Sequence, residues 1–158
     1  MKLALRHSLP ADVSDLHRLT AALIEVRLVT DFAHAGVVIE GVLYHATGVD
    51  GVHAEADADL SGYVLIDLGD ELDAVALARF AMVNGAAYDY VSLGAFVVAP
   101  VRDSQRWYCY ELAFFLMTGR NPLVRVTPEV LILTALGMGG RLISAVPQIK
   151  SRAVEVSQ

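Results

Sequence analysis

The sequence has little cysteine, little charge and no long apolar run, and each shortage excludes a class of protein. Among 158 residues the only cysteine is Cys109, so no disulfide can form within the chain. The first residues lack the apolar core of a signal peptide. No stretch approaches the about 20 uninterrupted apolar residues of a membrane span. We therefore expect a protein that does not span a membrane, is not exported by a signal peptide and is located in the cytoplasm.

The charge balance argues against a nucleic-acid partner. Charged residues make up 19% of the chain, the formal net charge is −6, and no run of lysine and arginine occurs. Binding to nucleic acid depends on neutralising phosphates, which this composition does not favour. With 55% hydrophobic residues, the chain is expected to form a compact core, and its length suits a single domain over 1–158.

Runs of aliphatic and β-branched residues predict a set of antiparallel strands. A first strand is expected over 2–6, and a meander over 34–68 with a tight turn at Glu40 and Gly41. The strands expected in this meander are 34–40, 42–46, 52–55 and 62–68.

Three- and four-residue spacing of apolar residues predicts helices between and after these strands. They are expected after Ser14, over 71–84, over 107–117 with a stop at Gly119, and over 127–137. The segment 141–158 is left as a terminal strand or a partner-binding tail. Together the elements predict an α+β fold in which an antiparallel sheet packs against helices.

Cys109 stands in the first turn of the expected helix over 107–117. Unpaired N–H groups and the helix dipole favour thiolate at that position, which would make Cys109 a nucleophile near neutral pH. A small buried hydrophobic residue is the alternative for a lone cysteine in an apolar helix.

Two histidines lie on strands that a turn at Glu40 and Gly41 would bring together. His34 opens one strand and His45 lies on the next, so their imidazoles could share one face. A thiol needs a base, and the base needs a partner that holds its tautomer. Surface or purely structural histidines are the alternative.

These segments carry a resemblance to a known family. The strands resemble the strand signature of the NlpC-type papain-like peptidases, in the segments His34-Ala35-Gly36-Val37-Val38-Ile39, Tyr44-His45-Ala46 and Gly51-Val52. The order, with the cysteine after the histidines, is similar to the circularly permuted, YiiX-like branch and its phage and prophage relatives. Tyr88-Asp89, Thr127-Pro128 and Leu131 also look like that branch. The chain departs from it at Tyr110, where the branch usually has serine, and at Ala35, where it has a bulkier residue.

The resemblance implies a permuted papain-like fold and a set of site residues. Cys109 would be the nucleophile, His34 the general base and His45 the group that orients His34. The backbone N–H of Cys109 would belong to the oxyanion hole. Further contacts near the substrate or oxyanion would come from Tyr88, Tyr110 and Glu111, although bracing the helix start is the role favoured for Glu111.

The implied activity is that of a thiol hydrolase, a cysteine peptidase or amidase that cleaves an amide through a thioester. Peptidoglycan stem peptides are the substrates that the resemblance favours. A lipid acyltransferase or thioesterase is the alternative enzyme, and a catalytically degenerate phage structural or assembly module is the non-enzymatic alternative.

We expect no cofactor and no metal. A zinc site of His34, His45, His53 and Cys109 would have suitable ligand types, but the spacings match no common zinc pattern. A phage virion component or a second copy of the chain stays open as a partner, and a virion stays open as a location.

Overall fold

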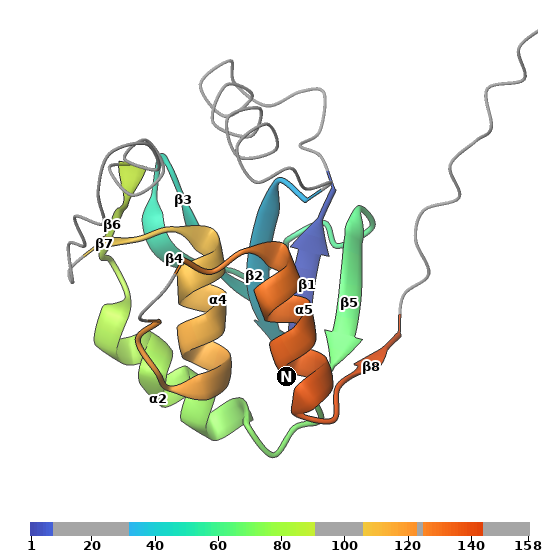
Figure 1. Ribbon diagram of the computed structural model, residues 1–158. Coiled ribbons are helices and arrows are strands. Elements are labelled where there is room, and N and C mark those ends of the chain that lie inside the picture. The colour runs from blue at the N-terminus through green and yellow to red at the C-terminus, as the bar shows by residue number, and fades with distance from the viewer. Residues whose placement is uncertain (8–31, 91–105, 123–124, 144–158) are drawn as a thin grey trace, which may run out of the picture.

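The computed structural model describes residues 1–7, 32–90, 106–122 and 125–143, which form a sheet with helices packed on one face (Figure 1). The helix expected after Ser14 and the segment from residue 144 onward lie outside the described residues. The fold is mixed α and β, as the sequence predicts.

The main sheet has six strands in the order β4-β3-β2-β1-β5-β8, and every neighbouring pair is antiparallel. The strand bounds are Lys2–Arg6 for β1, His34–Ile39 for β2, Val42–Thr47 for β3, Gly51–Glu55 for β4, Tyr63–Asp67 for β5 and Arg141–Leu142 for β8. The expected strands over 2–6, 34–40, 42–46, 52–55 and 62–68 are thus confirmed to within about two residues at each end. Arg141 and Leu142, the start of the segment left as a strand or a tail, pair with β5.

The expectation of one continuous meander over 34–68 is wrong for its last strand. Strands β2, β3 and β4 are consecutive neighbours, but β5 pairs with β1 instead of β4. The reason is the burial of β1, whose Leu3, Ala4 and Leu5 have no exposed surface. A strand buried on both faces sits inside a sheet and needs a partner along each edge. Strand β2 pairs with one edge and β5 with the other.

The turn between β2 and β3 fixes the register of the site strands. Glu40 and Gly41 have φ angles of 50° and 85°, as expected for a two-residue type I′ hairpin. This turn pairs Ile39 with Val42 and, further along the ladder, Gly36 with His45. The predicted turn at Glu40 and Gly41 is confirmed.

Three helices are described: α2 (Asp73–Val83), α4 (Cys109–Thr118) and α5 (Pro128–Gly137). Each expected helix within the described residues is confirmed, with α2 and α4 each starting two residues later than predicted. Helix α4 ends at Gly119, whose φ of 72° is left-handed. Helix α5 is capped by Thr127, whose hydroxyl accepts a hydrogen bond from the N–H of Val130 at 3.4 Å.

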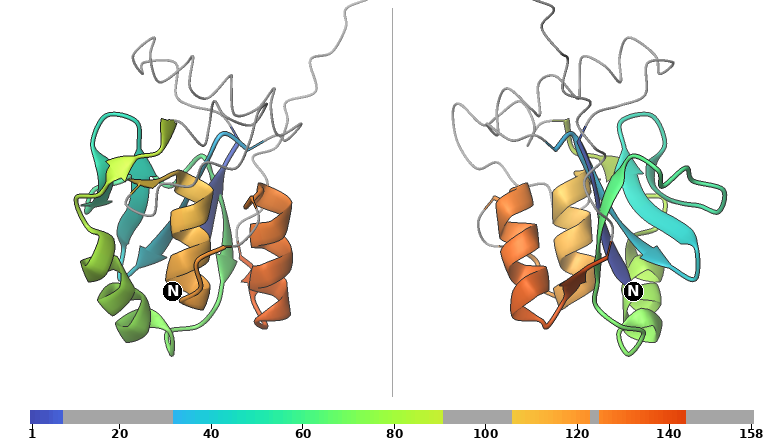
Figure 2. Two further views of the ribbon diagram at one scale, coloured as in Figure 1. Left: turned by 60° about the vertical axis from the view of Figure 1, so that its left-hand side comes forward. Right: turned by 90° about the vertical axis from the view of Figure 1, so that its right-hand side faces the viewer.

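A second, two-stranded sheet precedes α4. It pairs β6 (Ala87–Tyr88) with β7 (Arg106–Trp107) in parallel. Because β7 ends two residues before Cys109, this pairing brings Tyr88 to the start of α4. Figure 2 shows α4 and α5 on the same side of the main sheet.

Alternation along the strands divides the sheet into two faces. The main core is formed between the helices and the face that carries Leu3, Leu5, Ala35 and Val37. A smaller apolar cluster of Ala4, Val38, Leu43 and Tyr63 lies on the opposite face. His34, His45 and His53 belong by alternation to this second face.

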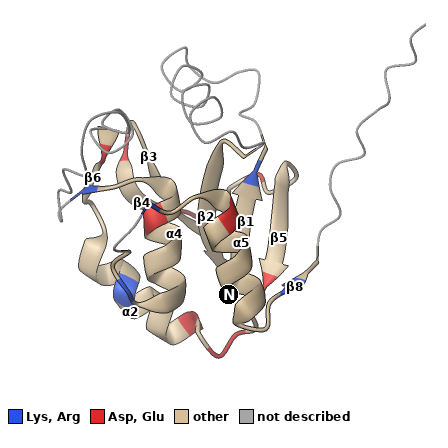
Figure 3. Cartoon of the chain, viewed as in Figure 1, with Lys and Arg blue, Asp and Glu red and all other residues tan. Residues whose placement is uncertain are grey.

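Charged side chains form no broad basic surface in the described part of the chain. Figure 3 shows its Lys and Arg residues spread singly over different elements. Among the described helices, none combines the length and the apolar character that crossing a bilayer would require.

Replacing Gly51 with alanine should destabilise the fold by about 2–5 kcal/mol. Gly51 has a φ of 66°, and a Cβ there would lie 2.3 Å from the carbonyl oxygen of Ala86. Gly41→Ala is the matched control, since its φ is 85° but no atom lies within 4 Å of its added Cβ. The control should cost about 1–2 kcal/mol. Equal losses in the urea-unfolding free energy of the two variants would contradict this account.

Candidate active site

Cys109 is the first residue of α4 and is completely buried. Its sulfur receives hydrogen bonds from the backbone N–H groups of Ala35 and Tyr110 and from the hydroxyl of Tyr88. The donors come from β2, α4 and β6, so three separate elements meet at the sulfur. The sulfur also lies against the residue that directly follows His34.

The end of the β2–β3 ladder explains why Ala35 can donate to the sulfur. Pairing of the two strands stops at Gly36 and His45, although β2 begins at His34 and β3 continues to Thr47. In a continued antiparallel ladder Ala35 would exchange hydrogen bonds with β3. The Cys109 sulfur accepts the N–H of Ala35 instead.

Tyr88 reaches Cys109 because β6 pairs with β7. Tyr88 lies opposite Trp107, and the N–H of Asp89 donates to the carbonyl of Trp107 at 3.2 Å. Tyr88 is buried, and its burial, followed by the nearby Cys109 sulfur, raises its pKa well above the ordinary value. The expected placement of the Tyr88 hydroxyl near Cys109 is therefore found.

The thiol itself differs from the prediction. Burial raises the pKa of Cys109 to about 11, although the N–H groups of Ala35 and Tyr110 and the hydroxyl of Tyr88 act in the opposite direction. The position of Cys109 at a helix start predicts a lowered pKa when burial is left out. Removal of the sulfur from water outweighs these donors, so the resting thiol is protonated at neutral pH.

His34 and His45 lie side by side, as the predicted hairpin requires. His34 Nε2 and His45 Nδ1 are 2.9 Å apart, and the two rings meet edge to face with centroids 5.1 Å apart. His45 is buried, and its burial, with the neighbouring His34 and His53, lowers its pKa to about 2. His45 is therefore a neutral imidazole at neutral pH.

The chain of hydrogen bonds continues from His45 to His53 and Gly51. His45 Nε2 is 2.9 Å from His53 Nε2, and His53 Nδ1 is 3.1 Å from the carbonyl oxygen of Gly51. A carbonyl oxygen can only accept, so His53 must carry its proton on Nδ1. When all three imidazoles are neutral, the hydrogen bond from His53 to Gly51 determines which nitrogen donates in each of the other two hydrogen bonds.

His53 Nε2 then accepts from the N–H at His45 Nε2, and His45 Nδ1 accepts from the N–H at His34 Nε2. Nδ1 of His34 is left as its unprotonated nitrogen. The Glu55 carboxylate, 3.5 Å from His45 Nε2, favours the same arrangement because its negative charge attracts a proton at that nitrogen. The tautomer suited to a general base at His34 is thus set by the peptide carbonyl of Gly51.

Tyr110 and Glu111 hold the start of α4. The Tyr110 hydroxyl donates to the carbonyl of Phe32 at 2.6 Å, which ties the helix to the residues that lead into β2. Glu111 lies in the first turn of α4 and is buried. The pKa of Tyr108 is raised mainly by the burial of Tyr108 and next by the charge of Glu111. Both placements match a bracing role for these side chains.

His53 and Glu55 were not predicted as site residues. His53 lies directly opposite His45, and Glu55 lies opposite Leu43, so both share the His45 face. The sequence signal for this contact is the turn over residues 48–50, because a hairpin centred on Val49 pairs His45 with His53.

Strand alternation also limits how the thiol and the imidazoles can meet. Ala35 faces the helices, whereas His34 starts on the opposite face of the sheet. A reaction between the two groups therefore has to take place around the end of β2 where its pairing with β3 has stopped, and not across the core.

Comparison with protein-family models gives no match, and comparison with curated proteins gives none either. The candidate site therefore stands on its own geometry.

Alkylation of Cys109 by iodoacetamide should rise about tenfold per pH unit between pH 7 and 10, because only the thiolate reacts. Tyr88→Phe removes a donor to the sulfur, which raises the thiol pKa further and should slow the reaction about tenfold at a given pH. Tyr44→Phe, on β3 and packed against Phe80, is the control and should leave the rate unchanged. A rate that levels off below pH 8, or equal rates in both variants, would contradict the assignment.

Proposed function

We propose that the chain is a thiol hydrolase that cleaves an amide bond, with Cys109 as nucleophile, His34 as general base and His45 as the residue that orients His34. One observation carries the proposal. The buried sulfur at the start of α4 contacts the backbone of Ala35, while the preceding residue, His34, is hydrogen-bonded to His45. The proposed nucleophile, base and orienting group therefore lie at the same end of β2, the sulfur on the helix face and the imidazoles on the other face.

The chemistry starts from a neutral pair. As the sulfur attacks the substrate carbonyl, the thiol proton passes to Nδ1 of His34 and an S–C bond forms. The C–N bond then breaks, and the imidazolium returns the proton to the leaving amine. Water attacks the thioester with His34 again as base, which releases the acid and restores the thiol.

The raised pKa of Cys109 fits general-base catalysis better than a preformed thiolate. A thiol that is protonated at rest needs a base within reach at the moment of attack, and the tautomer of His34 supplies an unprotonated nitrogen. The N–H of Cys109, at the start of α4, is the donor assigned to the oxyanion; at rest it is hydrogen-bonded to the Cys109 sulfur and would have to turn to the oxyanion.

Access to the sulfur sets a requirement on the mechanism. Cys109 has no exposed surface, so a substrate can reach it only after a movement that uncovers the start of α4. The hydrogen bonds that would have to yield or adjust are those from Tyr88 and Ala35.

The finer assignments rest on the resemblance to the permuted NlpC-type enzymes. They are a permuted papain-like arrangement of the sheet and helices, and a short peptide amide, such as a peptidoglycan stem peptide, as substrate. The same thioester could also be formed from or passed to a lipid ester, so lipid acyl transfer belongs in the test.

A non-catalytic module is the second candidate, and the burial of Cys109 favours it. A fully buried thiol with a pKa of about 11 is also what a purely structural cysteine would show. In that case the chain would act through a binding partner, for example as a structural component of a phage particle.

Cys109→Ala should abolish hydrolysis, because no other residue can form the thioester. The full chain and its variants would be assayed on stem-peptide amides, an acyl thioester and a phospholipid ester, with product release followed by mass spectrometry. His34→Ala should lower the turnover rate by about 10²–10⁴-fold, and His45→Ala should lower it less. Tyr44→Phe serves as the control with unchanged turnover.

Turnover retained in Cys109→Ala would contradict the proposal directly. Absence of turnover on all three substrate classes by the intact chain would favour the non-catalytic module.

A further inference from the structure

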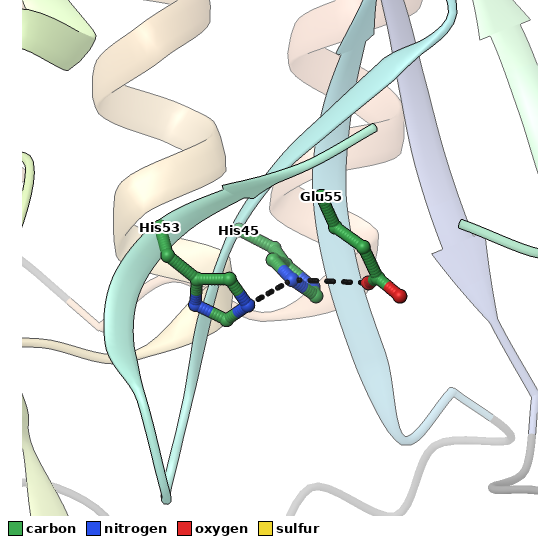
Figure 4. Close-up of side chains that lie close together, drawn as sticks. All are labelled: His45, His53 and Glu55. Carbon is green, nitrogen blue, oxygen red and sulfur yellow. Dashed lines mark hydrogen bonds and ion pairs between the residues drawn. The ribbon is translucent and has the colours of Figure 1, made fainter. Parts of the chain in front are cut away.

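Three potential metal ligands meet on the face of the sheet turned away from the helices (Figure 4). They are Nε2 of His45, Nε2 of His53 and a carboxylate oxygen of Glu55, and these atoms all lie within 4.8 Å of one another. The two nitrogens are 2.9 Å apart, and His45 Nε2 is 3.5 Å from Glu55 Oε2.

The sheet holds these groups together without any help from a loop. His45 on β3 is paired directly with His53 on β4, and Glu55 follows two residues later on the same face of β4. Side chains on directly paired and diagonal positions of two antiparallel strands are within reach of one another. A site built on two paired strands is also rigid, which suits a metal that demands fixed geometry.

Two of the three ligand separations lie close to those around a tetrahedral cation, and the third, between His53 and Glu55, is within 4.8 Å. Zinc binds imidazole nitrogen and carboxylate oxygen at about 2.0–2.2 Å, which places neighbouring ligand atoms about 3.3 Å apart. That value lies between the distance from His45 Nε2 to His53 Nε2, 2.9 Å, and the distance from His45 Nε2 to Glu55 Oε2, 3.5 Å. Two imidazoles and one carboxylate, with a further position for water, is a donor set that zinc accepts.

We propose that His45, His53 and Glu55 form a binding site for Zn²⁺ or a chemically similar divalent transition-metal ion. The exposure of the three ligands increases along the site, since His45 is buried, His53 is half-buried and Glu55 is exposed. A cation can therefore enter from the Glu55 side.

The remaining nitrogens of the two imidazoles provide the outer contacts of such a site. His53 Nδ1 donates to the carbonyl of Gly51, the outer contact that orients many metal-bound histidines. His45 Nδ1 faces His34 Nε2 at 2.9 Å. The metal site therefore shares His45 with the thiol site.

Sharing His45 has a consequence that rests on the proposed function. A cation on His45 Nε2 displaces the proton from that nitrogen, and the neutral imidazole then carries its proton on Nδ1. Nδ1 now donates to His34 Nε2, so His34 holds its own proton on Nδ1 and loses the nitrogen that would act as base. Metal binding would therefore switch off the activation of Cys109.

Metal binding can be tested on the full chain, free of any polyhistidine tag, by titration with CoCl2 and ZnCl2 followed by visible absorption and calorimetry. One equivalent of Co²⁺ should bind with the absorption of a tetrahedral site, and Zn²⁺ should displace it. His53→Gln and Glu55→Gln should each weaken binding by at least about tenfold, whereas MgCl2 should not compete.

Two further variants make the test specific. Glu71→Gln changes an exposed acid before α2 and should leave binding intact, as should Cys109→Ser. The proposal is overturned if no stoichiometric binding occurs, if His53→Gln and Glu55→Gln bind as the unaltered chain does, or if Cys109→Ser abolishes binding.

The effect on the proposed reaction of Cys109 is measured separately, as the turnover rate on the amide substrate with and without Zn²⁺, because alkylation follows the thiolate and does not use His34 as a base. The rate should fall by at least about tenfold in the unaltered chain and stay constant in Glu55→Gln. Binding of the metal with no change in rate would leave the metal site standing and contradict the role of His34. Absence of metal binding in a chain that hydrolyses amides would overturn the metal site and leave the proposed function standing.

Discussion

The contact between the start of α4 and the start of β2 organises this molecule. At that contact the Cys109 sulfur accepts the N–H of Ala35, and the Tyr110 hydroxyl donates to the carbonyl of Phe32. The two bonds join segments far apart in the chain and fix the helix where the β2–β3 ladder has ended. Without that interruption the N–H of Ala35 would be used within the sheet, and the sulfur would have no donor from β2.

A second constraint runs along the other face of the sheet, from the carbonyl of Gly51 to His34. Because a carbonyl can only accept, one peptide group determines the proton positions on three successive imidazoles. The same chain explains why two functions can compete for His45. Its Nε2 serves either as a donor to His53 or as a ligand to a metal, and each choice leaves His34 in a different tautomer.

Much of the fold was predictable because its signals are local. The strand at 34–39 and the turn at Glu40 and Gly41 follow from β-branched runs and a residue type that tolerates positive φ. The boundaries of α4 and α5 follow from Gly119 and from the capping Thr127. The partner of β5 was not predictable in this way, because a strand pattern does not encode which edge it pairs with.

The site shows the same division between local and distant causes. The side-chain contact between His34 and His45 depends only on the hairpin between them, and the sequence predicts it. The raised pKa of Cys109 depends on burial by residues distant in the chain, so position at a helix start pointed in the wrong direction. His53 was not predicted as a partner of His45, because their contact depends on the register of the second hairpin.

The most direct test is the tautomeric state of the histidines, read from imidazole ¹⁵N chemical shifts of the metal-free chain at pH 7.5. His53 is expected to carry its proton on Nδ1, whereas His45 and His34 are expected to carry theirs on Nε2. His53→Gln should weaken this preference at His34. A His34 imidazole protonated on Nδ1 in the unaltered, metal-free chain would contradict the account, because that nitrogen could not then take the proton of Cys109.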